Sequence, residues 1–405
     1  MRTFAKSDKL HGVCYDVRGP VLDAANEMKR QGMEILQLNI GNPAPFGFQA
    51  PSWILDAIRD ALDDPMSQGY SESNGIVEAR EAILDYHQSK GLPNLEMNHI
   101  YIGNGVSEMI SLAMQGLLND GDEILIPAPD YPLWTAAAKL AGGTPVHYIC
   151  DEKSNWYPDI ADMEKKINSR TKGIVIINPN NPTGALYPKE VLEQIVELAR
   201  RHELILFADE IYDRLVFDGK THTSIASLAP DLFVVTFNGL SKSDCIAGFR
   251  SGWMVLSGDL SKGKGYIEGI NMLSSMRLCA NVLAQHVVAP ALKNKPDVDP
   301  LLLPGGRLYE QRKCICEAID GVDGLSVVHP EAAFYIFPRI DAKRFGIQND
   351  EQFVLDFLRE KHVLLVHGGG FNWANPDHFR IVYLPEVSVL TESMKKMDEF
   401  LEKYR

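Results

Sequence analysis

The middle of the chain alternates short apolar runs with segments of helical periodicity. Apolar runs begin at Glu123, Gly173, Glu203 and Leu232, and each ends in residues that favour turns. Between two of these runs, residues 187–202 place apolar side chains at helical spacing, with charged residues on the opposite face. This alternation predicts β-α-β units, so we expect an α/β fold with a mainly parallel sheet covered by helices.

The flanking segments follow different patterns. Residues 248–256 return too soon for a helical crossover, which predicts an antiparallel strand, and residues 265–292 have few helix breakers, which predicts one long helix. Short strand-like runs between helical segments near the C-terminus are typical of a smaller α+β domain. We therefore expect residues 1–50 to pack with the small domain, residues 51–290 to form the large domain, and residues 291–405 to complete the small domain.

Composition narrows the class of protein. The 405 residues are 45% hydrophobic, which excludes a disordered chain, and 54 acidic against 40 basic residues give a net charge of −14. Such acidity disfavours nucleic acid and anionic membranes as partners but leaves room for a local anion pocket. The six cysteines and the histidines lack metal-ligand spacing, so we expect no metal site. Neither a signal peptide nor a membrane span is evident, which predicts a cytoplasmic protein.

Polar residues follow three consecutive apolar runs. Asn178 begins the segment NPNNPTG, Asp209 ends the next run, and Lys242 follows the third. In open parallel sheets, ligands bind beyond the carboxyl ends of the strands, so these residues are expected to meet. Pyridoxal phosphate requires a lysine for its aldehyde and an acid beside its ring nitrogen.

A phosphate group requires its own donors. The segment GNGVSE, residues 103–108, precedes an amphipathic helix whose first amides and the Ser107 hydroxyl suit an anion. Arg250, eight residues after Lys242, supplies a cation. The sequence therefore predicts a pyridoxal-phosphate site.

Six motifs occur in order along the chain: GNGVSE, APDYPLW, NPNNPTG, FADEIYD, NGLSK and AGFRSGW. Together they resemble the class I/II aminotransferases of the fold-type I pyridoxal-phosphate superfamily, and the resemblance covers essentially the whole chain. The segments CYDVRGPVLDAA, LNIGNPAPFGF, PSWILDAI and HFRIVYLP are similar to those of bacterial alanine aminotransferases.

This resemblance implies a role for each matching cofactor residue. Lys242 would form the Schiff base and carry the proton from the substrate Cα, and Asp209 would face the ring nitrogen. Tyr131 would stack on the ring, while Tyr212 and Asn181 would donate to its O3′ oxygen. The phosphate would be held by Gly105, Val106, Ser107 and Arg250, with Ser241 as a further contact.

The resemblance also implies a substrate site and a partner. Arg380 would bind the substrate α-carboxylate beside Gly41, and Tyr15 and Arg18 would close over the substrate. Tyr70 matches a tyrosine that reaches the phosphate of a neighbouring subunit, so a homodimer with shared active sites is expected.

The implied reaction is a ping-pong transfer from L-alanine to 2-oxoglutarate, which yields pyruvate and L-glutamate. Three alternatives stay open: another amino donor such as valine, an aromatic amino acid or aspartate; a C–S β-lyase on the same fold; and a non-enzymatic regulator. The acidic charge and the short segment before Tyr15 disfavour a DNA-binding regulator. Arg18 and Arg277 are the candidates for the distal carboxylate of glutamate.

One segment departs from the family pattern. Ser243, Asp244 and Cys245 follow Lys242, where relatives usually carry an aromatic residue or histidine and then a basic or polar one. Asp244 brings negative charge towards a phosphate pocket, so it should point to solvent or pair with a lysine. Cys245 is expected to be buried and unreactive.

Overall fold

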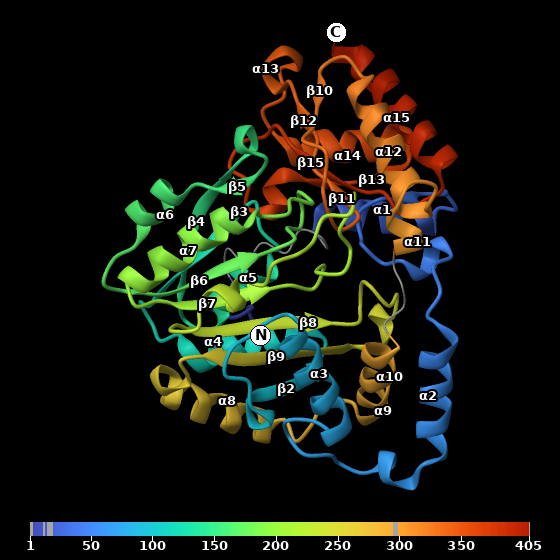
Figure 1. The fold of residues 1–405 in the computed structure, drawn as a ribbon. Helices are drawn as coiled ribbons and strands as arrows, with labels where there is room; N and C mark the ends of the chain where they lie inside the picture. The colour runs from blue at the N-terminus through green and yellow to red at the C-terminus, as the bar shows by residue number, and fades with distance from the viewer. Residues whose placement is uncertain (1–2, 11–12, 14–18, 295–298, 405) are drawn as a thin grey trace.

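A computed structural model describes residues 3–10, 13, 19–294 and 299–404. Its centre is an eight-stranded sheet with the order β2-β9-β8-β7-β6-β3-β4-β5 (Figure 1). The strands of this sheet are β2 Ile100–Asn104, β3 Glu123–Ala128, β4 Thr144–Asp151, β5 Tyr157–Pro158, β6 Thr171–Ile177, β7 Ile205–Asp209, β8 Phe233–Gly239 and β9 Ser251–Gly258. Parallel pairing runs from β8 through β7, β6 and β3 to β4, which confirms the predicted mainly parallel sheet.

Strand β9 is the antiparallel strand that the short connection predicts. It pairs antiparallel with β8 on one side and with β2 on the other. Gly239 at the end of β8 therefore lies opposite Gly252 near the start of β9, and the loop between them carries Lys242 and Arg250. Both side chains consequently emerge at one edge of the sheet.

Helices cover both faces of the sheet. Side chains of α4, α5 and α8 pack on one face and those of α6 and α7 on the other. Side chains of α2, α3 and α10 close the side near β2 and β9, and α9 contacts α2 and α3. The bounds of these helices are α2 Ser52–Asp63, α3 Val77–Ser89, α4 Val106–Leu117, α5 Leu133–Leu140, α6 Ile160–Lys166, α7 Lys189–Arg201, α8 Lys264–Met276, α9 Val282–His286 and α10 Val288–Lys293. No helix among the described residues is long and apolar enough to cross a membrane.

The C-terminal elements form a second, smaller assembly above the large sheet (Figure 1). It contains the helices α11 Asp299–Leu302, α12 Arg307–Asp320, α13 Ala342–Phe345, α14 Asp350–Lys361 and α15 Val387–Leu401. Its short strands are β10 Leu325–Ser326, β11 Tyr335–Ile336, β12 Arg339–Ile340, β13 Val363–Leu364, β14 Val366–His367 and β15 Phe379–Val382. Helix α1, Pro20–Arg30, packs on α14, and β1, Leu36–Gln37, pairs in parallel with β13.

The predicted single helix over residues 265–292 is wrong. The chain forms α8, α9 and α10 instead, and the break follows Met276, where Leu278 takes a left-handed conformation with φ of 71°. Asn281 then starts α9 by accepting a hydrogen bond from the Ala284 amide. Periodicity continues through the break because each short helix still presents apolar residues to the core, so the pattern alone did not reveal it.

Candidate active site

The carboxyl ends of β6, β7 and β8 lie side by side, because Ile177 pairs with Asp209 and Asp209 pairs with Phe237. A cavity of about 510 Å³ opens at this edge. Eleven of the residues proposed from the sequence line it: Gly41, Val106, Ser107, Tyr131, Asn181, Asp209, Tyr212, Ser241, Lys242, Arg250 and Arg380. The remaining lining residues are Ile40, Asn42, Ile177, Ile211, Ala247, Gly248 and Tyr335.

Lys242 projects into this cavity from the loop after β8. Its Nζ donates to the Gly41 carbonyl oxygen at 2.8 Å and lies 5.9 Å from the centroid of the Tyr212 ring. The amine is partly exposed to the cavity, where a small molecule can reach it. A lysine placed in this way can act as a nucleophile or carry a proton.

Asp209 is almost fully buried at the end of β7. Its Oδ2 accepts a hydrogen bond from Trp134 Nε1 at 3.2 Å. Burial raises the pKa of Asp209 to about 6, because a carboxylate loses its hydration there, and the Lys242 charge only partly opposes this rise. The ionised form would be stabilised by a cationic group in the cavity, such as a protonated ring nitrogen.

The first turn of α4 and Arg250 form an anion cradle. Gly105 precedes α4 with φ of 82°, and a Cβ at this position would collide with Arg250 Nη2. Glycine therefore lets the guanidinium approach the free amides at the start of the helix. Val106 and Ser107 line the cavity beside this cradle, and Arg250 is solvent-exposed at its mouth. These donors and this charge fit a phosphate group.

Arg380 occupies the opposite wall, on β15. Its Nη1 donates to Asn181 Oδ1 at 2.9 Å, and its Nη2 donates to the Asn39 carbonyl oxygen. The guanidinium lies 4.6 Å from the ring centroids of both Tyr335 and Phe371. Aromatic faces and amide oxygens hold the planar group in place, so it is oriented for a carboxylate.

Two side chains of the site are not singled out by any pattern in the sequence. Trp134, the partner of Asp209, lies in the APDYPLW motif but received no role. Tyr335 comes from the C-terminal assembly, and its hydroxyl oxygen lies 2.8 Å from that of Tyr212. No local signal distinguished Tyr335 from a core aromatic, because only the fold brings it to Tyr212.

A buried ion cluster lies close to the ends of β7 and β8. Lys90 Nζ is 2.7 Å from Glu210 Oε2 and 2.8 Å from Asp213 Oδ2, and Asn238 Nδ2 donates to the same Asp213 oxygen. Burial would raise the pKa of Asp213, but the Lys90 ammonium lowers it well below its usual value. Glu210, Asp213 and His222 also bring metal-ligand atom types within 4.8 Å, a grouping that sequence spacing did not predict. Lys90 supplies positive charge at that point.

The segment after Lys242 corrects the expectation for Asp244. This carboxylate is buried and pairs with an arginine, Arg214, at 3.1 Å rather than pointing to solvent or pairing with a lysine. Ser243 Oγ donates to it as well. Cys245 is partly buried, and burial raises the pKa of its thiol to about 11, which keeps it protonated at neutral pH.

Several proposed residues lie outside this cavity. Tyr70 is 81% exposed and does not line it, and Arg277 is held by Glu108 Oε2 at 2.6 Å and by the Ile102 carbonyl oxygen at 2.6 Å. Arg277 is thus not placed to bind a substrate carboxylate in this cavity. Tyr15 and Arg18 lie outside the described residues.

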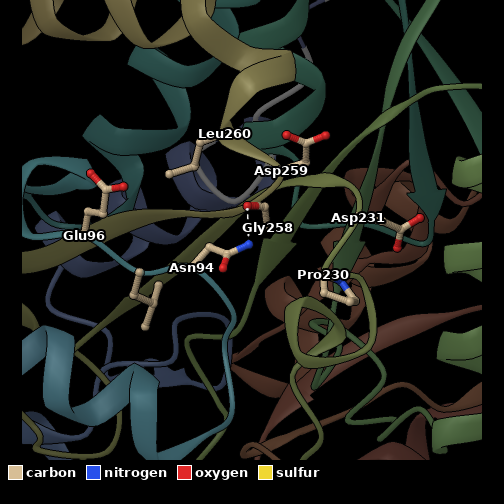
Figure 2. A pocket seen from close by; sticks show the side chains of 8 residues that line it. Asn94, Glu96, Pro230, Asp231, Gly258, Asp259 and Leu260 are labelled. Carbon is tan, nitrogen blue, oxygen red and sulfur yellow. Dashed lines mark hydrogen bonds between the residues drawn. The ribbon is translucent and has the colours of Figure 1, made fainter.

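A second hollow, of about 540 Å³, lies at the opposite edge of the sheet, since Gly258 pairs with Phe233 at the start of β8 (Figure 2). Its eight lining residues are Asn94, Leu95, Glu96, Pro230, Asp231, Gly258, Asp259 and Leu260. This set contains three acids and neither lysine nor arginine, so the hollow lacks the amine and the guanidinium groups that line the first cavity.

The strand order, the accompanying small sheets, and an amine beside a buried acid at the strand ends together define a fold-type I transferase. Residues 33–396 match the family described as aminotransferase class I and II, and the chain belongs to this family.

Similar proteins span the whole chain. It is 57% identical over 405 residues to glutamate-pyruvate aminotransferase AlaA of Escherichia coli strain K12, with 100% of this chain and 99% of that protein covered. It is 51% identical to alanine aminotransferase of Mycobacterium tuberculosis strain H37Rv, with 100% and 94% covered. A crystal structure of an aminotransferase from Escherichia coli matches with a TM-score of 0.98 at 56% identity, covering 100% of this chain and 99% of that one.

Proposed function

We propose that this protein is a pyridoxal-phosphate-dependent aminotransferase that converts L-alanine and 2-oxoglutarate to pyruvate and L-glutamate. One observation carries the cofactor assignment: Lys242, Asp209, Arg250 and Arg380 all line a single cavity. The full-length relatives with glutamate-pyruvate and alanine aminotransferase names support the choice of substrates.

The residues of the cavity fit this cofactor. Its phosphate would lie at the cradle of α4 and Arg250, its ring nitrogen beside the buried Asp209, and its ring against Tyr131. When bound, pyridoxal phosphate supplies an electrophilic aldehyde and a ring that accepts the electron pair released at the substrate Cα. Lys242 would supply the amine that holds the cofactor covalently.

The side chains of the cavity would have separate roles in the reaction. Arg380 binds the α-carboxylate and so fixes the Cα of the substrate, and Asn181 orients Arg380 through its 2.9 Å hydrogen bond. Lys242 Nζ, which projects into the cavity, would take the proton from that carbon. Asp209 would stay ionised next to a cationic ring nitrogen, because opposite charges stabilise each other.

Attachment of the cofactor to Lys242 is the direct test. Borohydride reduction of the loaded wild-type protein, followed by peptide mass spectrometry, should place the reduced cofactor on Lys242. Lys242→Ala should lose both the label and turnover, whereas the exposed Lys172→Ala should keep both. A label on another lysine in the wild-type protein, or turnover by Lys242→Ala, would disprove the assignment.

The substrate is tested separately with the first half of the reaction. Loaded enzyme is mixed with one amino acid at a time, and the change in cofactor absorbance is timed. We expect L-alanine and L-glutamate to give the fastest changes. A rate for alanine no higher than for aspartate, valine or phenylalanine would remove alanine as the substrate but leave the aminotransferase intact. Release of ammonia and pyruvate from a cysteine conjugate, without conversion of the cofactor, would indicate a β-lyase instead.

We also propose a homodimer. Tyr70 is exposed, although Arg277 Nη2 and Gln285 Nε2 hold its segment through the Ser73 carbonyl oxygen and the Ser71 hydroxyl. Exposed apolar side chains accompany it: Met66, Met272, Met276 and Leu278. A fixed segment with an exposed tyrosine suits a role in a neighbouring subunit's site. Sedimentation should give a dimer, and Tyr70→Phe should weaken cofactor binding.

The cytoplasmic location and the domain bounds stay predictions.

A further inference from the structure

Tyr335 joins the two walls of the active-site cavity. It lies on β11, which pairs antiparallel with β15, the strand that carries Arg380. Only 2% of the residue is exposed, yet it lines the cavity. It therefore belongs to the C-terminal assembly while its hydroxyl reaches the cofactor domain.

Three neighbours fix the position of Tyr335. Its Oη lies 2.8 Å from Tyr212 Oη, and its ring face lies 4.6 Å from the Arg380 guanidinium carbon. The hydroxyl also fills the space above Gly41, where a Cβ would collide with it. A phenol held by a ring contact, a hydroxyl contact and a backbone has little freedom to turn away.

The hydroxyl pair leaves one proton available. Two phenols carry two protons, and one of these protons makes the bond between them. Within the described residues, neither hydroxyl has another hydrogen-bond partner. One phenol of the pair therefore keeps a proton that a ligand in the cavity could accept, since both residues line the cavity. Which phenol keeps it depends on which one donates in the Tyr212–Tyr335 hydrogen bond.

The charge of Arg380 sets the direction of this hydrogen bond. The Arg380 guanidinium lies against the Tyr335 ring. A phenol that donates a hydrogen bond gains negative charge, and the guanidinium stabilises that charge on Tyr335. Tyr335 is therefore favoured as the donor. Tyr212 Oη then accepts, and its own proton is free for an oxygen of a ligand. A hydroxyl that accepts one hydrogen bond also donates a stronger one.

We propose that Tyr335 is a positioning residue of the reaction: it donates to Tyr212 and thereby directs and strengthens the hydrogen bond that Tyr212 donates to the cofactor O3′ oxygen. This inference rests on the proposed function. It predicts that Tyr335 acts only through Tyr212 and does not itself contact the reacting atoms.

The test compares four variants of the loaded enzyme: Tyr335→Phe, Tyr212→Phe, their double variant and Tyr383→Phe. Tyr383 is a matched control because it is equally buried and donates to the Ala333 carbonyl oxygen, outside the cavity. The readout is the pH midpoint of the cofactor's visible absorbance, with thermal unfolding measured alongside.

A weaker donor stabilises the anionic O3′ oxygen less, so the midpoint should rise. We expect the midpoint to rise by about half a pH unit to one pH unit in Tyr335→Phe, which corresponds to the loss of one hydrogen bond. The rise should be larger in Tyr212→Phe and absent in Tyr383→Phe. The double variant should match Tyr212→Phe. The inference is overturned if Tyr335→Phe raises the midpoint by the same amount in the Tyr212→Phe background as in the wild-type protein. It is also overturned if Tyr335→Phe and Tyr383→Phe have the same midpoint. Failure of the wild-type protein to take up the cofactor would instead count against the proposed function.

Discussion

Asp209→Asn is expected to stabilise the protein when the cofactor has been removed. Burial raises the pKa of Asp209 from 3.8 to about 6, so the folded protein holds a proton that the unfolded chain releases. The free energy of unfolding must therefore fall as the pH rises from about 4 to about 6, by up to about 3 kcal/mol. Asparagine carries no charge, and its amide oxygen can still accept from Trp134.

The assay is denaturant unfolding of both cofactor-free proteins between pH 4 and pH 8. The two should be nearly equal at pH 4, and Asp209→Asn should be more stable at pH 8 by about 2–3 kcal/mol, most of which is reached by pH 6. Asp213→Asn is the matched control, and we expect it to lower the free energy of unfolding at pH 8. Lys90 lowers the pKa of the Asp213 carboxylate and would lose one of its two anionic partners in this variant. Parallel curves for wild type and Asp209→Asn would refute the reasoning.

Three further outcomes follow from contacts in the site. Gly105→Ala should weaken cofactor binding by tenfold or more in a fluorescence titration, because the new Cβ collides with Arg250 and the backbone has φ of 82°; unchanged affinity would contradict the cradle. Arg380→Lys should raise the KM for amino acids by about tenfold or more while the cofactor spectrum is retained, since one ammonium replaces a planar fork; steady-state kinetics check this. Arg214→Met should lower the free energy of unfolding at pH 8 by about 3 kcal/mol, because the buried Asp244 carboxylate loses its partner, and by less at pH 4, where that carboxyl can be protonated.

The parts of the fold that the sequence predicts are those governed by local pattern. Buried parallel strands appear as continuous apolar runs, so the runs ending at Ile177 and Asp209 mark their own carboxyl ends. Ligands bind beyond the carboxyl ends of parallel strands, and Asp209 and Lys242 do line one cavity there. Asn178 does not line that cavity, because its side chain accepts a hydrogen bond from the Tyr187 amide, and Asn181 from the same segment lines it instead.

The missed features depend on contacts between distant segments. Asp244 finds its partner Arg214 30 residues away on another loop, and Tyr335 reaches Tyr212 only because β11 pairs with β15. The helix break after Met276 allows Arg277 to bind Glu108 and backbone carbonyl oxygens. These contacts stabilise the broken helix more than continued helical hydrogen bonding would. Tertiary contacts of this kind leave no trace in the spacing of apolar residues.

The backbone just after β1 constrains how the molecule is made. Asn39 accepts a hydrogen bond from Arg380, Gly41 accepts one from Lys242, and Leu36 pairs with Val363. During synthesis, residues 36–41 leave the ribosome more than 300 residues before the last of these partners. The central sheet can fold first, but the site for the substrate carboxylate forms only after β15, which carries Arg380, has been synthesised. A truncated product would therefore present an exposed N-terminal helix and no substrate site, which makes completed translation a requirement for activity.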